Sequence, residues 1–425
     1  MILKLNKYII LLLFNCAFLL GYSQEKSGTQ NVLILEAYAH LGNGEVLKNS
    51  AIGIKGETIT LVEDYSRKNI DTSFYDVIIH AKNKHLYPGF IAMNSTLGLL
   101  EIGAVRATRD YQEAGRFNPN SRTLTVFNTD SRITPTVRSN GVLMGQISPR
   151  GGTISGQSSV MHFNGWNWED AVIKADEGIH LNWPNINLKK VNSYNNSTQQ
   201  INEFFEKSLA YSKAKETTID LRLKSMADIF TGEKRLYIHA EEVNQLKDIV
   251  IFKNKFKIPK LTIVGGAESH YIPEILLANN ISVLVKRVHS LPLYSQDKLT
   301  SAYELPALLY KNGVKFCFQN QGDMEQMQTR NLPFLAGTAV AYGLPYEEAI
   351  KALTSNSADL LGLKNYGTIK VGYSATLFIS EGDALDVISN KITHAYIKGT
   401  KINLSNHQTE NYLKYTSKYG LEPKP

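Results

Sequence analysis

Short apolar runs separated by polar turns mark both ends of the chain. Near the start, four such runs cover residues 32–35, 50–54, 58–62 and 77–79. Turn sequences at 42–44 (GNG) and 55–57 (KGE) separate the first three runs, a pattern typical of β-hairpins. Two more runs, 375–379 and 392–402, lie near the other end. The pattern therefore predicts β-rich segments at both ends of the chain.

Between these ends the pattern changes to apolar runs that alternate with helix-sized intervals. The runs are residues 236–239, 261–264, 281–285 and 314–318. In the first interval Val243, Leu246 and Val250 recur at helical spacing. Strands that alternate with helices predict a parallel sheet or barrel with both faces covered. The polar stretch 192–200 is interpreted as an exposed connection.

The segment from residue 97 to residue 182 follows this alternation poorly and is interpreted as a long insertion or a set of loops. It contains seven arginines and the glycine-rich turn 149–153. Guanidinium groups near a barrel mouth would clamp a carboxylate or phosphate. Surface salt bridges are the alternative for the arginines, and core packing for the tryptophans. The pocket candidates from this segment are Arg106, Arg109, Trp166 and Trp168.

The first residues predict export. Lys4 and Lys7 precede an apolar run, 8–20, that is followed by small or turn-forming residues, which is typical of a secretory signal peptide ending at residue 23. The run has about 13 residues, fewer than the ~20 that a spanning helix needs. Without residues 1–23 the formal net charge falls from +7 to +5. We expect a periplasmic or secreted protein with no stable membrane span.

Composition limits the other classes of function. A chain of 425 residues with 43% hydrophobic residues can bury one large domain and a smaller companion. The basic residues are spread along the chain and form no lysine-rich run interleaved with aromatic residues. This distribution argues against a nucleic-acid partner.

Several motifs occur in the order found in one known family. Residues 149–159 (PRGGTISGQSS), 166–170 (WNWED), 180–184 (HLNWP), 343–358 (GLPYEEAIKALTSNSA) and 367–375 (GTIKVGYSA) resemble stretches of imidazolonepropionase-like amidohydrolases. The resemblance runs from about residue 32 to residue 404. It implies a TIM-like (β/α)₈ barrel with a composite β-sandwich formed by both chain ends. The implied division is a signal peptide 1–23, sandwich parts 24–86 and 366–425 with the tail, and a barrel 87–365.

The same resemblance indicates which metal-ligand positions are substituted. Residues 86–96 (LYPGFIAMNST) resemble the first-strand signature, whose two histidines fall here on Asn94 and Thr96. His239 matches the fifth-strand ligand, Gly265 falls at the sixth-strand ligand, and Gln321 near the eighth-strand aspartate. Amide and hydroxyl oxygens are weak zinc ligands. His239 is therefore the metal candidate in register, its alternative being a histidine that forms hydrogen bonds without metal.

Two residues lie close enough in sequence to replace lost ligands. His270 follows the sixth predicted strand, and Asp323 follows the eighth. Their alternatives are an ordinary surface or cleft histidine and a solvated loop acid.

Two functional hypotheses remain open. In the first, the protein is a metal-poor or catalytically impaired amidohydrolase relative that binds a small molecule, or associates with an active homologue. In the second, it is an active hydrolase of non-peptide C–N bonds with a rearranged metal site around His239, drawing on His270, His162, Asp323 or Glu241. Only the active hydrolase requires a cofactor, zinc or another divalent metal.

Overall fold

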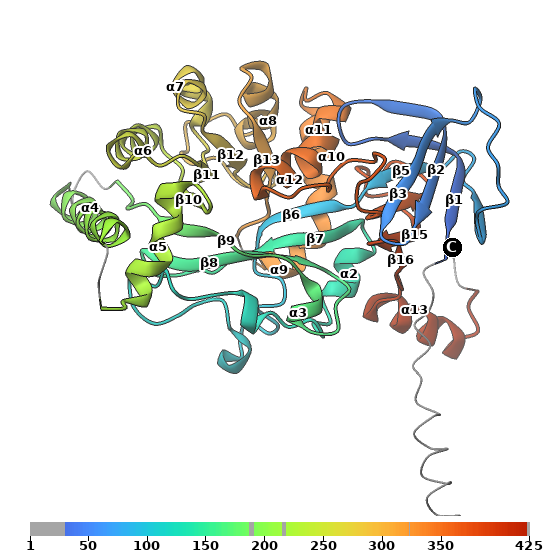
Figure 1. Cartoon of the computed structure of the whole chain (residues 1–425), viewed down its shortest axis with the longest axis horizontal. Helices are drawn as coiled ribbons and strands as arrows, with labels where there is room; N and C mark the ends of the chain where they lie inside the picture. Colours follow the sequence, from blue (N-terminus) through green and yellow to red (C-terminus); the bar gives the residue numbers. More distant parts are fainter. Residues whose placement is uncertain (1–29, 187–190, 215–217, 323, 423–425) are drawn as a thin grey trace, which may run out of the picture.

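The structure is a computed structural model that describes residues 30–186, 191–214, 218–322 and 324–422. The predicted signal peptide lies outside the described residues. Figure 1 shows a central barrel flanked by a second sheet, with helices around the barrel. In the described part of the chain no helix is long and apolar enough to cross a membrane.

The central sheet has eight strands, and each strand lies beside its neighbour in the chain. They are β6 (Phe90–Ser95), β7 (Val142–Ile147), β8 (Ile154–His162), β9 (Val172–Asn182), β10 (Arg235–Ala240), β11 (Leu261–Gly265), β12 (Ser282–Val285) and β13 (Phe316–Phe318). A parallel bridge between Met93 and Gln319 joins the first strand to the last, which nearly closes the barrel. The TIM-like fold class predicted from the sequence is confirmed.

One barrel strand runs against the others. β8 pairs antiparallel with both β7 and β9, whereas the remaining neighbours pair in parallel. The links before and after β8, 148–153 and 163–171, are shorter than the dozen or so residues that a parallel crossover needs. The prediction that 97–182 is an insertion or a set of loops is therefore wrong for 142–182, which supplies three barrel strands.

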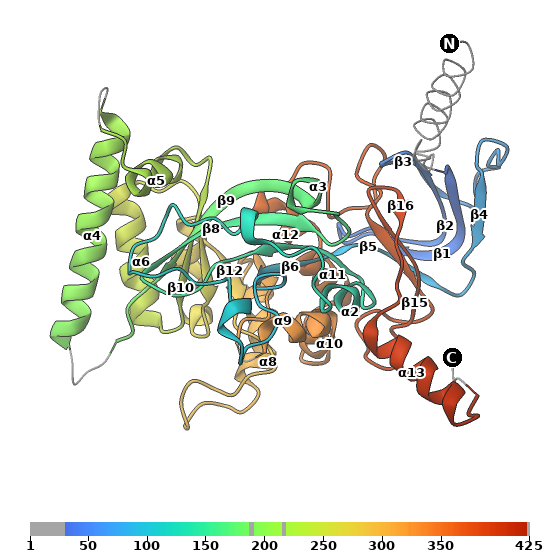
Figure 2. The same ribbon diagram turned by 90° about the horizontal axis from the view of Figure 1, so that it is seen from below.

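Helices cover the outside of the barrel, and α4 (Val191–Lys213) and α5 (Leu221–Thr231) lie on the side away from the second sheet (Figures 1 and 2). The other longer ones are α6 (Val243–Phe256), α8 (Ser301–Lys311), α10 (Leu332–Ala341) and α11 (Tyr346–Leu353). The last helix, α13 (His407–Lys418), lies beside the second sheet instead. The shorter ones are α2 (Thr134–Arg138), α3 (Trp168–Ala171), α7 (Pro273–Ala278), α9 (Glu325–Gln328) and α12 (Ser355–Leu361).

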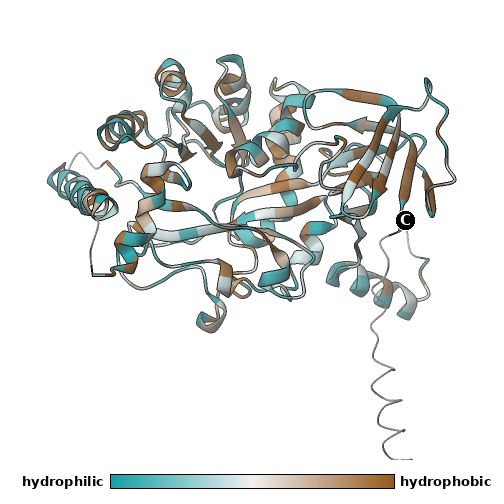
Figure 3. Ribbon diagram, in the orientation of Figure 1, coloured by the Kyte–Doolittle hydropathy of each residue, from teal (hydrophilic) through white to brown (hydrophobic). Residues whose placement is uncertain are grey.

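The first part of α4 corrects the prediction of an exposed connection at 192–200. Its sequence is polar there, but the helix continues to Ile201 and Phe205, which are fully buried. Phe205 packs on Phe252 and Phe256 of α6, with ring centroids 4.7 and 5.5 Å apart. The buried face of the second half therefore packs the helix against α6. Figure 3 shows the contrast between the hydrophilic surface of α4 and the hydrophobic barrel strands.

The second sheet joins the two ends of the chain. Its strands are β1 (Val32–His40), β2 (Val46–Lys55), β3 (Thr58–Asp64), β4 (Val77–His80), β5 (His85–Pro88), β14 (Leu377–Ser380), β15 (Ile392–Ile397) and β16 (Thr400–Lys401). β5 pairs with both β1 and β14, so the N-terminal and C-terminal strands form one sheet. Gly89 links β5 to β6 where a Cβ would lie only 2.9 Å from the Thr376 methyl group. This close approach places the second sheet directly against the start of the barrel.

Candidate functional site

A cavity of about 530 Å³ lies at the barrel mouth, where strands β9 to β13 end. Parallel barrels of this kind keep their functional sites at the carboxyl ends of the strands. The lining residues are Asn182, Trp183, Asn185, His239, Ala240, Glu241, Val264, Lys286, Arg287, Ser290, Gln319, Gln321 and Gly322.

Asn94, Gln321 and His239, which stand at predicted metal-ligand positions, contact one another beside this cavity. Gln321 Oε1 accepts a hydrogen bond from Asn94 Nδ2 at 3.0 Å and lies 3.2 Å from His239 Nδ1. Asn94 has a φ of +52° where the β6–β7 pairing is irregular, a conformation that asparagine tolerates better than most residues. Thr96 follows the end of β6, and its buried hydroxyl has no partner among the described residues.

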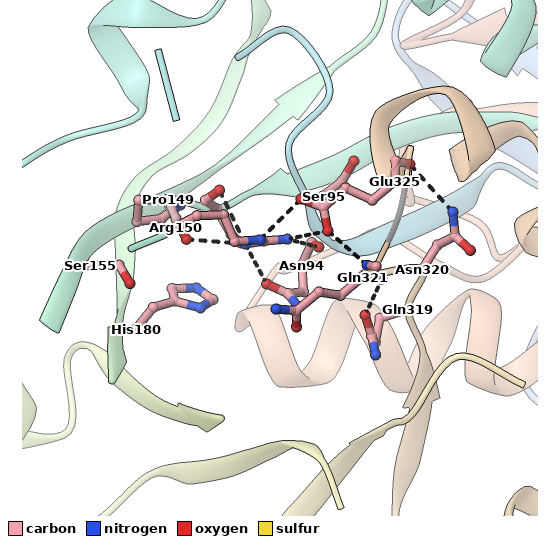
Figure 4. Close-up of polar contacts among 12 residues, drawn as sticks. Asn94, Ser95, Pro149, Arg150, Ser155, His180, Gln319, Asn320, Gln321 and Glu325 are labelled. Carbon is pink, nitrogen blue, oxygen red and sulfur yellow. Dashed lines mark hydrogen bonds and ion pairs between the residues drawn. The ribbon is translucent and has the colours of Figure 1, made fainter. Parts of the chain in front are cut away.

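Arg150 brings a positive charge to the first-strand ligand position. It lies in the turn between β7 and β8, and Nη1 donates to Asn94 Oδ1 at 3.0 Å while Nη2 donates to the Asn94 carbonyl at 2.8 Å (Figure 4). Nε and Nη2 also pair with the two carboxylate oxygens of Glu325 at 3.1 and 3.2 Å. The side chains of Arg150 and Glu325 are only 13% and 12% exposed, so this ion pair is largely shielded from water.

His239 forms a pair with a second histidine, His180, at the end of β9. His180 Nδ1 lies 3.0 Å from His239 Nε2. Because Gln321 Oε1 can only accept, Nδ1 of His239 carries the proton, and neutral His239 accepts at Nε2 from His180. Burial lowers the pKa of His239 to about 3, and the charge of Arg150 acts in the same direction. Both imidazoles are therefore held neutral, since burial also lowers the pKa of His180.

Glu241 occupies the space beside the sixth-strand ligand position. Gly265 has a φ of +101°, and a Cβ there would lie 2.5 Å from Glu241 Oε1. Glu241 Oε2 accepts a hydrogen bond from the Ala267 backbone N–H at 3.0 Å. Burial raises the pKa of Glu241 to about 7, while the Ala267 hydrogen bond and the Lys286 charge oppose the shift. A histidine at residue 265 would collide with this carboxyl group.

A buried carboxyl group supports the site from inside the barrel. Glu177 accepts from Gln146 Nε2 at 2.5 Å, from the Ser158 hydroxyl at 2.6 Å and from the Tyr237 hydroxyl at 3.0 Å. Gln146 Oε1 in turn accepts from the Asn94 backbone N–H at 3.0 Å. Glu177 thus fixes a chain of polar contacts that ends at the first-strand ligand position, although burial raises its pKa.

These residues do not fit a catalytic divalent metal. Within the described ranges no group of three or more His, Cys, Asp or Glu residues is placed to hold a metal ion. The Nε2 lone pair of His239 already accepts a hydrogen bond, and the guanidinium of Arg150 would repel a cation. A catalytic zinc site commonly has three protein ligands, and amide oxygens are poor substitutes.

The remaining metal candidates lie away from the mouth cavity or outside the described residues. His270 lines a separate cavity of about 340 Å³, and its buried Nδ1 has no partner among the described residues. His162 ends β8 at the opposite end of the barrel, where Nε2 lies 2.8 Å from the Asp170 carbonyl. Asp323 falls outside the described residues.

The four pocket candidates do not line the mouth cavity. Arg106 and Arg109 are exposed near a short 3₁₀ helix, Arg106–Thr108. Trp166 is 90% exposed, and Trp168 packs in part against the main core. Of the arginines in the segment 97–182, Arg150 is the one that contacts Asn94 beside the cavity.

The sequence reasoning did not assign roles to His180, Arg150 or Glu325. His180 lies in a stretch that already carried the family resemblance, and its strand position was the available signal. The pairing of Arg150 with Glu325 joins residues 175 positions apart and has no local sequence signal.

Comparison with known proteins supports the fold and points to the amidohydrolase superfamily. A profile of the Amidohydrolase family matches residues 225–403. Amidohydrolase tasK of Hapsidospora irregularis is 23% identical over 188 residues, which are 43% of this chain and only 18% of that protein. The crystal structure of an amidohydrolase from Thermotoga maritima MSB8 superposes with a TM-score of 0.76 at 23% identity, covering 88% of this chain and 99% of that one.

A more distant structural neighbour is a prolidase complexed with N-methylphosphonate-L-proline. Its TM-score is 0.52 at 14% identity, with 88% of this chain and 99% of that chain covered. At these identities the structural likeness establishes the fold alone. The family profile and the sequence relative support membership of the amidohydrolase superfamily, and the solved structures share the fold of the chain.

Proposed function

We propose that this chain is an exported, ligand-binding member of the superfamily, in its imidazolonepropionase-like branch, that has lost metal-dependent hydrolysis. The observation that carries the proposal is the pairing of Arg150 with Asn94, which puts a guanidinium where the first-strand metal ligands belong. Family membership supports a hydrolase ancestry, and the retained mouth cavity supports binding of a small molecule. Export rests on the sequence of residues 1–23.

Electrostatics support the loss of metal. The Arg150 guanidinium forms a two-pronged pair with Glu325 in a shielded position, so its charge is fixed there. Glu241 fills the space next to Gly265, so the sixth-strand position has been rebuilt as well. Two ligand positions have thus acquired new contacts that stabilise the site without metal.

One observation favours the alternative, an active hydrolase with a rearranged site around His239. Nδ1 of His180 and Nε2 of His239 are 3.0 Å apart, so two imidazole nitrogens converge on one point. Loss of the proton from His180 Nδ1, with His180 as the other tautomer, would leave a lone pair on each of these nitrogens for a metal. The charge of Arg150 and the lack of a third His, Cys, Asp or Glu ligand among the described residues weigh against this arrangement.

The test compares turnover and thermal stability with zinc and with a chelator. Cyclic amides and dipeptides serve as substrates, and His239→Ala is the comparison variant. A metal at 100 times its Kd would stabilise the folded protein by about 2.7 kcal/mol. We expect no zinc-dependent turnover and the same melting temperature in both conditions. Turnover that zinc restores after chelation, and that His239→Ala abolishes, would establish the alternative.

An active homologue is the protein partner that this proposal implies. A barrel without its own catalytic centre would influence hydrolysis by binding to a catalytically active homologue. Co-purification with a catalytically active relative would support that role. Binding of small molecules without any association with such a relative would contradict it.

A further inference from the structure

The mouth cavity has polar groups that the protein itself does not use, and most of them are hydrogen-bond donors. Lys286 follows the end of β12 and forms no ion pair within the described residues. Its ammonium donates to the Leu291 carbonyl at 3.5 Å. The buried hydroxyl of Ser290 has no partner in the described part of the chain.

Gln321 supplies a third donor. Its side-chain oxygen is occupied by Asn94 and His239, which fixes the orientation of the amide group. Its Nε2 forms no hydrogen bond to any described residue, and the side chain lines the cavity. Lys286, Ser290 and Gln321 all line this cavity, and an ammonium, a hydroxyl and an amide N–H group match the oxygens of an anion.

The charges around the cavity favour the same class of ligand. Arg287 and Lys286 both line the wall formed by the segment after β12. The acid in the lining is Glu241, which accepts from the Ala267 N–H through one oxygen and packs against Gly265. His239 has both ring nitrogens engaged with Gln321 and His180, and the charge of Glu325 is already paired with Arg150.

We propose that the mouth cavity binds a small molecule through an oxyanion, a carboxylate or a phosphate group, that is held by Lys286, Ser290 and Gln321. The inference rests on the proposed ligand-binding function and names the ligand's chemical class. Glu241 is left to accept a hydrogen bond from the rest of the ligand. The backbone fixes the site, since the Lys286 N–H donates to the Gly265 carbonyl at 2.7 Å.

Titration calorimetry with inorganic phosphate and, separately, with acetate tests the site on the purified protein. Lys286→Gln should weaken binding of the preferred anion at least about tenfold, because it removes a charge-assisted hydrogen bond. Lys286→Arg should retain most of the affinity, and Ser290→Ala should weaken it less than Lys286→Gln. Binding of phosphate, of acetate or of both that Lys286→Gln weakens supports the site and identifies the anion.

Lys315→Gln is the matched control. It makes the same change of charge at the opposite end of the barrel, where Lys315 pairs with Asp359 at 2.9 Å. Binding of neither anion, or equal losses in Lys286→Gln and Lys315→Gln, would overturn the site. Circular dichroism of each variant checks that it is folded, and a Lys286→Gln variant that is unfolded is replaced in the comparison by Ser290→Ala.

The test of the anion site can fail or succeed independently of the test for loss of hydrolysis. Zinc-dependent turnover together with anion binding through Lys286 would refute the loss of hydrolysis and leave the anion site standing. No anion binding in a protein without turnover would overturn the anion site alone.

Discussion

Replacing Glu241 with glutamine tests the environment of the rebuilt sixth-strand position. The substitution keeps a side-chain oxygen to accept the Ala267 N–H, which donates at 3.0 Å in the wild type. It removes only the ionisation of a carboxyl group whose pKa burial raises from 4.5 to about 7. The hydrogen bond from Ala267 and the charge of Lys286 act against that shift but do not cancel it.

The sign of the effect follows from the protons that each state binds. Between pH 4.5 and pH 7 the folded protein keeps a proton on Glu241 that the unfolded chain has released. The stability contributed by this group is therefore complete below pH 4.5 and is lost as the pH rises to about 7. At about 1.4 kcal/mol per pKa unit, the loss is about 3 kcal/mol.

Unfolding by urea at several values between pH 5 and pH 8 measures this loss. Subtracting the free energy of unfolding of Glu241→Gln from that of the wild type removes the pH dependence that comes from the titrating groups both proteins share. The wild type should lose about 2.5 kcal/mol relative to the variant across this range, because part of the total is already lost at pH 5. The exposed substitution Glu233→Gln controls for net charge and should show no such trend. Parallel pH profiles for the wild type and Glu241→Gln would refute the reasoning.

Three further substitutions test the packing that holds the site. Arg150→Met should destabilise by about 3–5 kcal/mol in chemical unfolding, because it leaves Glu325 charged, shielded and unpaired; a loss below ~1 kcal/mol would show that the pair is solvated. Gly265→Ala should destabilise the wild type but cost less in a Glu241→Ala background, since the added Cβ meets that carboxyl group; equal costs in a double-mutant cycle would contradict this contact. Phe205→Ala should cost about 3–5 kcal/mol by thermal or urea unfolding, and an unchanged midpoint would show that α4 is not anchored by this ring.

The regular half of the barrel was predictable because each strand there is a continuous apolar run. Strands β10 to β13 are buried on both faces and are separated by helices with their own periodicity. β7, β8 and β9 escaped prediction for a physical reason. Short antiparallel links replace crossover helices, and buried polar residues such as Gln146 and Ser158 interrupt the apolar pattern. Hydrophobic periodicity is a weak guide to such strands.

The candidate site, like the barrel, could be predicted only in part from the sequence. His239 was placed by its strand, and its position at the end of β10 beside the mouth cavity follows from the same register. The sequence predicted substituted ligand positions at Asn94 and Gly265, but not the contacts that these residues make. Arg150, in the turn after β7, meets Asn94 at the end of β6, and Glu241, just after β10, lies against Gly265 at the end of β11. Contacts between neighbouring strands that are far apart in sequence depend on the fold and leave no local pattern.

Metal content is the most direct test of the central claim that Arg150 and Glu241 have replaced a catalytic metal centre. The protein lacking residues 1–23 is exposed to zinc, manganese and iron, freed of unbound metal and measured by elemental analysis beside His239→Ala. The account predicts far less than one metal per chain, with no difference between the two proteins. About one metal per chain in the wild type, lost in His239→Ala, would contradict it.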